Sequence, residues 1–117
     1  MITVYGLKNC DTCRKARKWL TAQGLEHRFH DVRADGLDAT TVKAWTATLG
    51  WEKLLNRRGT TWRGLGDADK QDLDQEKAVA LMTAQPALIK RPVFDVAGTY
   101  ALGFDDQVQT MLNGENS

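Results

Sequence analysis

The chain has 117 residues, a length that suits one domain of ordinary size with a hydrophobic core of its own. Its 16 Lys and Arg nearly balance its 15 Asp and Glu, which argues against a protein that binds nucleic acid directly. There is no apolar run of membrane-spanning length and no signal-peptide pattern, and two cysteines three positions apart do not make a disulfide framework. We therefore expect a cytoplasmic protein without a membrane partner.

The first third of the chain predicts a β-α-β unit. Residues 2–5 have the apolar pattern of a short strand, and residues 11–23 carry apolar side chains at helical spacing before a glycine stop. Residues 25–32 form a second strand pattern. Because a helix joins them, these two strands are expected to lie parallel.

The middle of the chain, about residues 38–85, predicts a block of helices. Asp38 can cap its first helix, and residues 51–55 can add one more turn. Residues 56–66 hold three arginines among Gly and Thr without a clear period, so we expect a loop there. Residues 67–85 are expected to be mainly helical.

The last third returns to β structure. Residues 92–96 and 99–102 flank Ala97-Gly98 and predict a tight hairpin. Asp105 can cap a final helix, and the polar tail at residues 113–117 is expected to fray.

This order of elements predicts an α/β protein with a thioredoxin-like fold. The helical insertion, about residues 38–85, would separate an N-terminal βαβ unit from a C-terminal ββα unit, within a single domain over residues 1–117.

Cys10 and Cys13 lie where the first predicted strand is followed by the first predicted helix. A cysteine at a helix N-terminus faces unpaired N–H groups and the positive end of the helix dipole, which both stabilise a thiolate. Nearby Lys and Arg residues strengthen this effect, and Asp11 opposes it. Cys10 is therefore the candidate nucleophile, and Cys13, one turn on, can form a reversible disulfide with it. Taken alone, the pair also fits two ordinary buried thiols.

His27 and His30 complete a pattern, Cys-x2-Cys-x13-His-x2-His, that resembles a zinc ligand set. Residues three apart on a strand point to opposite faces of the sheet, so both histidines could hardly reach one ion. We expect no metal site.

Three ordered motifs lie at separations typical of a known family. They are Tyr5–Ala16 (YGLKNCDTCRKA), Leu55–Trp62 (LNRRGTTW) and Leu88–Val93 (LIKRPV). With them, nearly the whole chain resembles the arsenate reductase (ArsC) family. The branch it resembles most holds the small YffB-type reductases, and the family also includes the Spx/MgsR regulators.

The resemblance implies roles for several residues. Cys10 matches the family's catalytic cysteine, and Arg91 matches an arginine that holds an oxyanion or thiolate beside it. Arg57, with Arg58 as the alternative, matches a second arginine of the site. Pro92 matches a cis-proline that presents backbone to a bound thiol substrate. On the residues alone, Arg91-Pro92 also fits a strand-starting proline beside a solvated arginine.

Two departures from the family pattern bear on the substrate. Arsenate reductases of the family have glycine after the catalytic cysteine and a third arginine in the hairpin, whereas this chain has Asp11 and no arginine in residues 100–103. Both changes weaken the binding of a multiply charged oxyanion. Arsenate is therefore less favoured than a disulfide or a mixed disulfide.

The remaining loop residues leave alternatives open. Cys13 could resolve a mixed disulfide on Cys10, act as a redox switch, or donate a weak S–H contact to the Cys10 thiolate. Thr12 and Arg14, with Arg58 and Pro92, are candidates for substrate binding, although Thr12 equally fits an ordinary first-turn residue.

The sequence thus predicts a thiol oxidoreductase of the arsenate reductase family, with glutathione as co-substrate and no tightly bound cofactor. Cys10, Arg91 and Arg57 are its catalytic candidates. The alternative is a redox-sensing transcriptional regulator of the Spx type, whose partner would be RNA polymerase.

Overall fold

The computed structural model describes residues 1–114, which form two compact units. Among the described residues, the first unit consists of residues 1–35 and 91–114, and the second consists of residues 36–90. The predicted helical insertion lies within the second unit. The prediction of a single domain stays a prediction.

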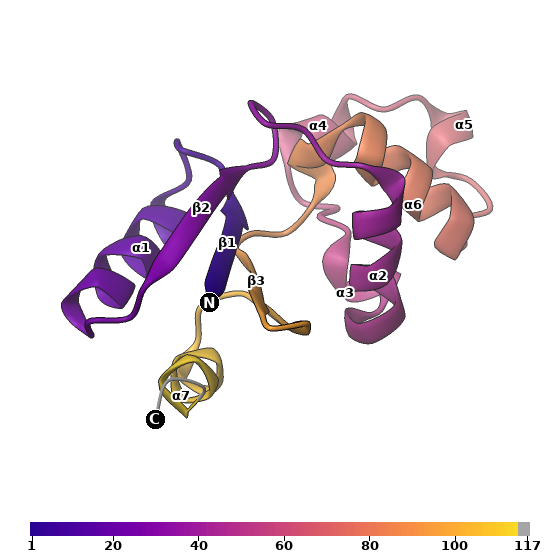
Figure 1. Ribbon diagram of the computed structural model, residues 1–117. Helices are drawn as coiled ribbons and strands as arrows, with labels where there is room; N and C mark the ends of the chain where they lie inside the picture. Colours follow the sequence, from indigo (N-terminus) through magenta and orange to yellow (C-terminus); the bar gives the residue numbers. More distant parts are fainter. Residues whose placement is uncertain (115–117) are drawn as a thin grey trace. The chain divides into compact units, whose positions relative to one another are not determined.

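The first unit contains the predicted βαβ and ββα elements. They are β1 (Ile2–Gly6), α1 (Asp11–Ala22), β2 (His27–Asp31), β3 (Val93–Val96), β4 (Thr99–Leu102) and α7 (Asp106–Gly114), and Figure 1 shows most of them labelled. Each confirms an element predicted from the pattern of apolar residues, to within a few residues at its ends.

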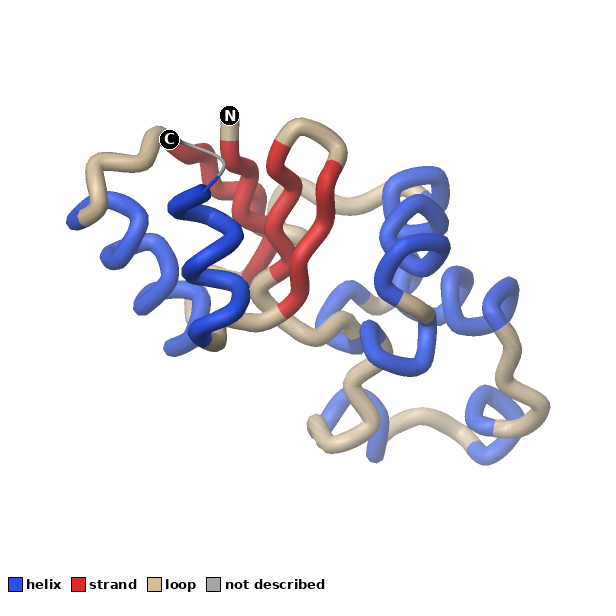
Figure 2. The backbone as a smooth tube through the Cα atoms, turned by 90° about the horizontal axis from the view of Figure 1, so that it is seen from below, coloured by secondary structure: helices blue, strands red, loops and turns tan. Residues whose placement is uncertain are grey.

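The four strands form one mixed sheet in the order β2-β1-β3-β4. β1 pairs parallel with β2 and antiparallel with β3, so Val4 lies between Phe29 and Phe94. β3 and β4 form the antiparallel hairpin. Two helices, α1 and α7, lie side by side on one face of this sheet (Figure 2). The fold is the predicted α/β, thioredoxin-like one.

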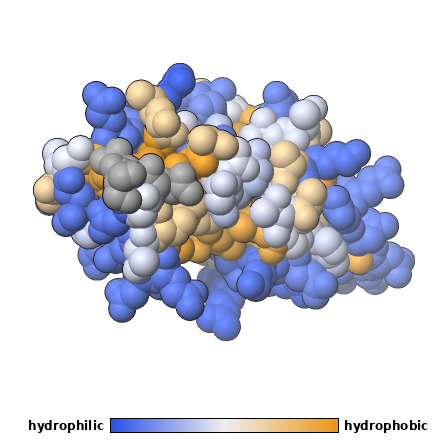
Figure 3. All heavy atoms as spheres, turned by 60° about the horizontal axis from the view of Figure 1, so that its bottom comes forward, coloured by the Kyte–Doolittle hydropathy of each residue, from blue (hydrophilic) through white to orange (hydrophobic). Residues whose placement is uncertain are grey.

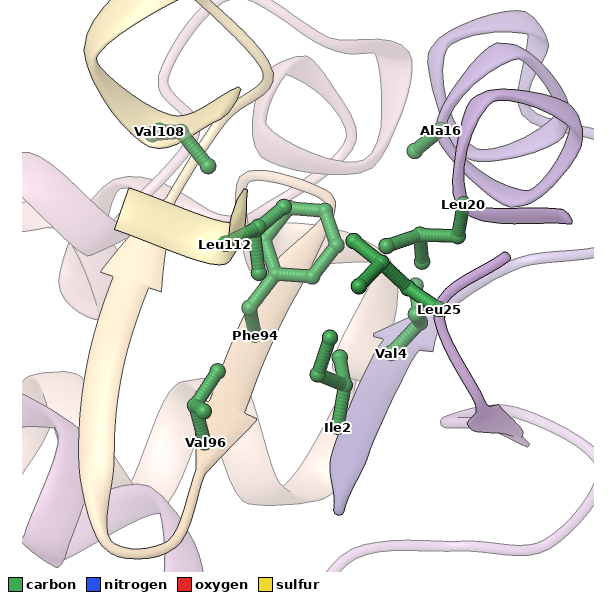
Figure 4. Close-up of a cluster of buried hydrophobic side chains, with 9 residues drawn as sticks. All are labelled: Ile2, Val4, Ala16, Leu20, Leu25, Phe94, Val96, Val108 and Leu112. Atoms are coloured by element: carbon green, nitrogen blue, oxygen red, sulfur yellow. The ribbon is translucent and has the colours of Figure 1, made fainter. Parts of the chain in front are cut away.

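The core of the first unit lies between this face of the sheet and the two helices. Along β1 every second residue is buried, because a strand turns alternate side chains to opposite faces. Phe94 from β3 lies at the centre of the close-up in Figure 4. The buried cluster consists of Ile2, Val4, Ala16, Leu20, Leu25, Phe94, Val96, Val108 and Leu112.

The C-terminal turn and cap follow the predicted chemistry. Ala97 and Gly98 have φ angles of 52° and 89°, so both central residues of the hairpin turn are left-handed. The Asp105 carboxylate accepts the Val108 N–H at 2.9 Å and caps α7. The predicted fraying from residue 113 is wrong for the first two tail residues, which end α7 at Gly114, and the rest of the tail lies outside the described residues.

The second unit is helical. Its elements are α2 (Ala39–Leu49), α3 (Trp51–Leu54), α4 (Thr60–Arg63), α5 (Asp67–Lys70), α6 (Gln75–Ala84) and the short 3-10 helix η1 (Pro86–Leu88). Its buried side chains include Val42, Trp45, Leu54, Leu55, Ala78, Val79, Met82, Leu88 and Ile89. Asp38 caps α2 as predicted, since its carboxylate accepts the Thr41 N–H at 2.8 Å.

Two segments of the second unit differ from the prediction. The expected loop at residues 56–66 contains the one-turn helix α4, which begins after Gly59 and ends before Gly64. The helix expected over residues 67–85 is broken, because Asp72 is left-handed with φ 51° and Asp74 caps a new helix, α6. An aspartate side chain that accepts an N–H group three residues later favours the start of a new helix over continuation of an earlier one.

Figure 3 shows one face, on which hydrophobic side chains come to the surface among hydrophilic ones. Within residues 1–114, Met1, at 71% exposure, is the only large hydrophobic residue on the exposed surface rather than buried or half-buried. No helix within these residues is both long enough and apolar enough to cross a bilayer.

Candidate functional site

Cys10 is the residue on which α1 begins. Its backbone is extended, with φ −93° and ψ 121°, and its carbonyl accepts the Arg14 N–H at 3.0 Å as the first bond of the helix. The Cys10 N–H donates to the Leu7 carbonyl at 3.2 Å, which closes the loop from β1. The thiol is therefore presented, partly exposed, at the N-terminus of α1.

Cys13 lies one turn into α1 and is fully buried. Its sulfur packs against Gly6, the last residue of β1, where any added Cβ would overlap it. The pKa of the Cys13 thiol rises to about 12, chiefly because of burial and also because of the neighbouring Cys10 sulfur. Cys13 therefore keeps its proton at neutral pH.

Arg91 and Pro92 bring the start of β3 to the same place. The Arg91–Pro92 peptide bond is cis, the isomer that the family resemblance implies. Arg91 hydrogen-bonds the Cys10 sulfur, and its Nε atom is buried. Pro92 is buried as well, and its carbonyl accepts the Gly103 N–H at 2.9 Å. The carbonyl contact links this end of β3 to the chain that follows β4.

Opposing effects act on the Cys10 thiol. Burial alone would raise the pKa of Cys10, but the Cys13 backbone N–H, the Cys13 thiol and the Arg91 guanidinium together lower the pKa below its ordinary value. The contact with the Cys13 N–H lacks the geometry of a full side-chain cap. The neutral thiol of Cys13 donates a hydrogen bond to the Cys10 sulfur and keeps its proton, so the lowered pKa of Cys10 and the raised pKa of Cys13 favour different protonation states.

Asp31, at the end of β2, supports the loop that leads to Cys10. Its side chain is 6% exposed, and one carboxylate oxygen accepts the Lys8 N–H at 3.2 Å. The other oxygen accepts the N–H groups of Arg33 and Ala34, both at 2.9 Å. The Ala34 N–H contributes most to holding the pKa of this carboxyl below its usual value, against the effect of burial.

Sequence reasoning missed both Asp31 and the role of Gly6. An aspartate at a strand end can accept N–H groups two and three residues later in a turn, which was the available signal for Asp31. Nothing in the sequence pairs Lys8 with Asp31 or Gly6 with Cys13, because these contacts depend on how β1, β2 and α1 pack.

Asp11, Thr12 and Arg14 occupy the exposed side of the first turn of α1. Asp11 and Arg14 form an ion pair, with side chains 82% and 55% exposed. The Arg14 guanidinium therefore offsets part of the negative charge that Asp11 adds beside the nucleophile. Substrate binding by Thr12 and Arg14 stays a prediction.

Arg57 and Arg58 belong to the second unit. The Arg57 guanidinium lies over two indole rings, at 5.5 Å from the centre of the Trp51 ring and 5.9 Å from that of Trp62. These cation–π contacts favour this position of the exposed arginine side chain. The Arg58 N–H donates to the Asn56 side chain at 3.0 Å. The catalytic or binding roles of both arginines stay predictions.

The two histidines of the zinc-like pattern have separate surroundings. His27 Nδ1 contacts the Leu25 carbonyl at 3.0 Å, and the His30 ring packs against Tyr5 at 5.0 Å between centres. Within residues 1–114, no group of three or more His, Cys, Asp or Glu side chains is placed to hold a metal ion.

Known proteins resemble this chain along nearly its whole length. An uncharacterized protein of Haemophilus influenzae is 45% identical over 107 residues, which cover 92% of this chain and 94% of that protein. The solved structure of a YffB protein superimposes with a TM-score of 0.91 at 44% identity, covering 96% of this chain and 98% of that one.

More distant relatives include regulators. The global transcriptional regulator Spx of Streptococcus pyogenes is 25% identical over 117 residues, covering 97% of this chain and 86% of that protein. The family model that matches residues 5–111 is the one described as the ArsC family. It includes the three motifs and the two cysteines on which the candidate site is built, and the chain belongs to the ArsC family.

Proposed function

We propose that the chain is a cytoplasmic thiol–disulfide reductase that takes its electrons from glutathione and holds no tightly bound cofactor. One observation carries the proposal: the Cys10 sulfur lies at a helix N-terminus with the Arg91 guanidinium and the Cys13 thiol as its partners, and its pKa is lowered. A stabilised thiolate that is partly exposed is the nucleophile of disulfide exchange.

The exchange would take two steps. The Cys10 thiolate attacks the glutathione sulfur of a mixed disulfide, a new S–S bond forms on Cys10, and the substrate leaves as a thiolate. A second glutathione thiolate then attacks the glutathione sulfur held on Cys10. Glutathione disulfide is released, the Cys10 thiolate is regenerated, and the substrate has gained the electrons.

The environment of Cys13 favours this monothiol route over the resolving role. A thiol attacks only as a thiolate, and the pKa of Cys13, raised to about 12, leaves very little thiolate at neutral pH. In this proposal Cys13 donates its S–H to Cys10 instead. Arg91 stabilises the thiolate that is present before the first step and after the second.

Arsenate is disfavoured as a substrate. A multiply charged oxyanion needs several guanidinium groups, and the hairpin β3–β4 has no arginine between Val93 and Leu102. A disulfide sulfur carries no net charge and needs one cationic partner for the leaving thiolate.

The test is NADPH consumption coupled through glutathione reductase, with a glutathione mixed disulfide and arsenate offered in parallel. We expect turnover of the mixed disulfide alone, none with Cys10→Ser, and retained activity with Cys13→Ser. Arg91→Ala should lower kcat/KM by about 10-fold to 100-fold, because it removes a hydrogen bond to a charged sulfur. It should also raise the pKa of Cys10, measured from alkylation rate against pH. Full activity in Cys10→Ser would mean that the nucleophile is misassigned.

A second candidate is a regulator that senses oxidation through Cys10 and Cys13 and binds RNA polymerase. The observation that favours it is the 25% identity with Spx along nearly the whole chain. Stoichiometric binding of purified RNA polymerase, together with no turnover of either substrate, would replace the reductase with this candidate.

A further inference from the structure

Positive charge is concentrated on α1, the helix that begins at the candidate nucleophile. The 12 residues of α1 include four of the chain's 16 Lys and Arg but only one of its 15 Asp and Glu. The four are Arg14, Lys15, Arg17 and Lys18. Outside α1, acidic residues outnumber basic ones, so this helix is a local cationic surface on a nearly neutral chain.

Three of these cations line a hollow between α1 and β2, the edge strand of the sheet. It measures about 370 Å³ and is lined by Arg14, Arg17, Lys18, Thr21 and His27. The Arg17 guanidinium lies 4.2 Å from the centre of the Phe29 ring, which restricts its motion. Within residues 1–114, Arg14 is paired with Asp11, and there is no ion pair on Arg17 or Lys18.

We propose that this hollow docks an acidic segment of a protein substrate while Cys10 reacts with that substrate's mixed disulfide. The inference rests on the proposed function and specifies its substrate class, a glutathionylated protein with carboxylates near its modified cysteine. Carboxylates match the guanidinium and ammonium groups of the hollow. The Thr21 hydroxyl, which also lines it, already donates to the Arg17 carbonyl at 3.1 Å.

Helix geometry gives the spacing of those carboxylates. An α-helix rises about 1.5 Å per residue, so Arg14 and Lys18 lie roughly 6 and 12 Å along the axis from Cys10. An extended peptide advances about 3.3 Å per residue. A substrate that runs along α1 from the nucleophile would therefore carry Asp or Glu about two to four residues from its disulfide cysteine.

The chemical step is unchanged by docking. Cys10 attacks the glutathione sulfur, the substrate's S–S bond breaks, and the acidic segment leaves as a thiolate. A second glutathione regenerates Cys10 and is the reductant. Docking favours capture of the substrate, so a substrate with the acidic segment should have a higher kcat/KM. This advantage should weaken as salt screens the attraction between the carboxylates and the cations of the hollow.

The experiment uses two peptides that share one glutathionylated cysteine. One carries Glu at the second, third and fourth positions after the cysteine, and the other carries Gln there. At low ionic strength we expect kcat/KM to be about fivefold to tenfold higher for the Glu peptide, because each partly exposed ion pair contributes little alone. The preference should disappear at high salt.

Two charge-reversal variants separate this hollow from a general effect of net charge. Lys18→Glu should abolish or invert the preference for the Glu peptide without changing the KM for glutathione. Lys53→Glu, an exposed residue of α3 with the same change in charge, should keep the preference. A Lys18→Glu variant with a higher KM for glutathione and an intact peptide preference would overturn the proposal, because the hollow would then bind glutathione.

A binding measurement distinguishes failure of docking from failure of the proposed function. Fluorescence anisotropy of cysteine-free versions of the two peptides is measured with the Cys10→Ser protein. Salt-sensitive binding of the Glu peptide alone supports docking, even when neither glutathionylated peptide is turned over. Equal turnover of both glutathionylated peptides overturns docking and leaves the reductase standing.

Discussion

Among single residues, Cys10 and Cys13 lie three positions apart but have pKa values shifted in opposite directions, because their surroundings differ. Cys10 is partly exposed and has Arg91 as a partner, so its thiolate is stabilised. Cys13 is buried against Gly6, and its pKa of about 12 keeps it protonated, so that it can act as a hydrogen-bond donor. The difference between the two pKa values has two main causes: burial, which raises the pKa of Cys13, and the hydrogen bonds to Cys10 from Cys13 and Arg91, which lower the pKa of Cys10.

Gly6→Ala should raise the pKa of Cys10. The new methyl group would overlap the Cys13 sulfur, which must then move and withdraw its S–H from Cys10. Overpacking should also cost about 1–3 kcal/mol of stability. The rate of iodoacetamide alkylation against pH measures the first effect and urea unfolding the second. The control is Gly66→Ala, where a Cβ has open space. An alkylation profile that matches the wild type would show that Cys13 does not support the thiolate.

At the scale of elements, hydrophobic periodicity was sufficient for the longer helices and the strands. α1, α2 and α7 have apolar stripes over several turns, and the β3–β4 hairpin has a recognisable turn. The sequence did not distinguish the one-turn helix α4 from a loop, or the one-turn helix α5 from part of a longer helix. Four residues are too few to show a helical period of apolar residues. The break before α6 depends on the left-handed backbone of Asp72 and the cap by Asp74, which compete with helix continuation.

The β3–β4 hairpin should be stabilised by Ala97→Asn. Ala97 has φ 52°, a region in which alanine is strained and asparagine is tolerated, and Asn-Gly is the preferred pair for such a turn. We expect a gain of about 0.5–1 kcal/mol in the free energy of unfolding, measured with urea. Ala97→Val is the opposing control and should destabilise, because a β-branched side chain fits this region poorly. If both variants lose stability equally, the turn geometry is not what limits the hairpin.

At the scale of the whole molecule, the candidate site is assembled from parts of the chain that lie far apart. Cys10 and Arg91 are 81 positions apart in the sequence, and pairing of β1 with β3 brings them together. The sequence indicated Cys10 through its local motif, whereas Arg91 was predicted only through the family resemblance. A local sequence pattern cannot show that two residues so far apart in the chain are in contact. Asp31 and Gly6 were missed for the same reason.

The pH dependence of overall stability should report on Asp31. In the folded protein its carboxylate accepts N–H groups from Ala34, Arg33 and Lys8, which lower its pKa below the ordinary 3.8. The unfolded chain therefore binds the proton at higher pH. The contribution of the Asp31 carboxylate to stability is complete above the ordinary pKa and is lost as pH falls through the folded pKa.

Asp31→Asn should cost about 1–2 kcal/mol near neutral pH, a difference from the wild type that shrinks below pH of about 4. Urea unfolding at a series of pH values measures this, with Asp69→Asn, at an exposed aspartate of α5, as the control. A difference between wild type and Asp31→Asn that stays constant down to pH of about 2 would mean that the carboxylate charge is not what holds the Cys10 loop to β2.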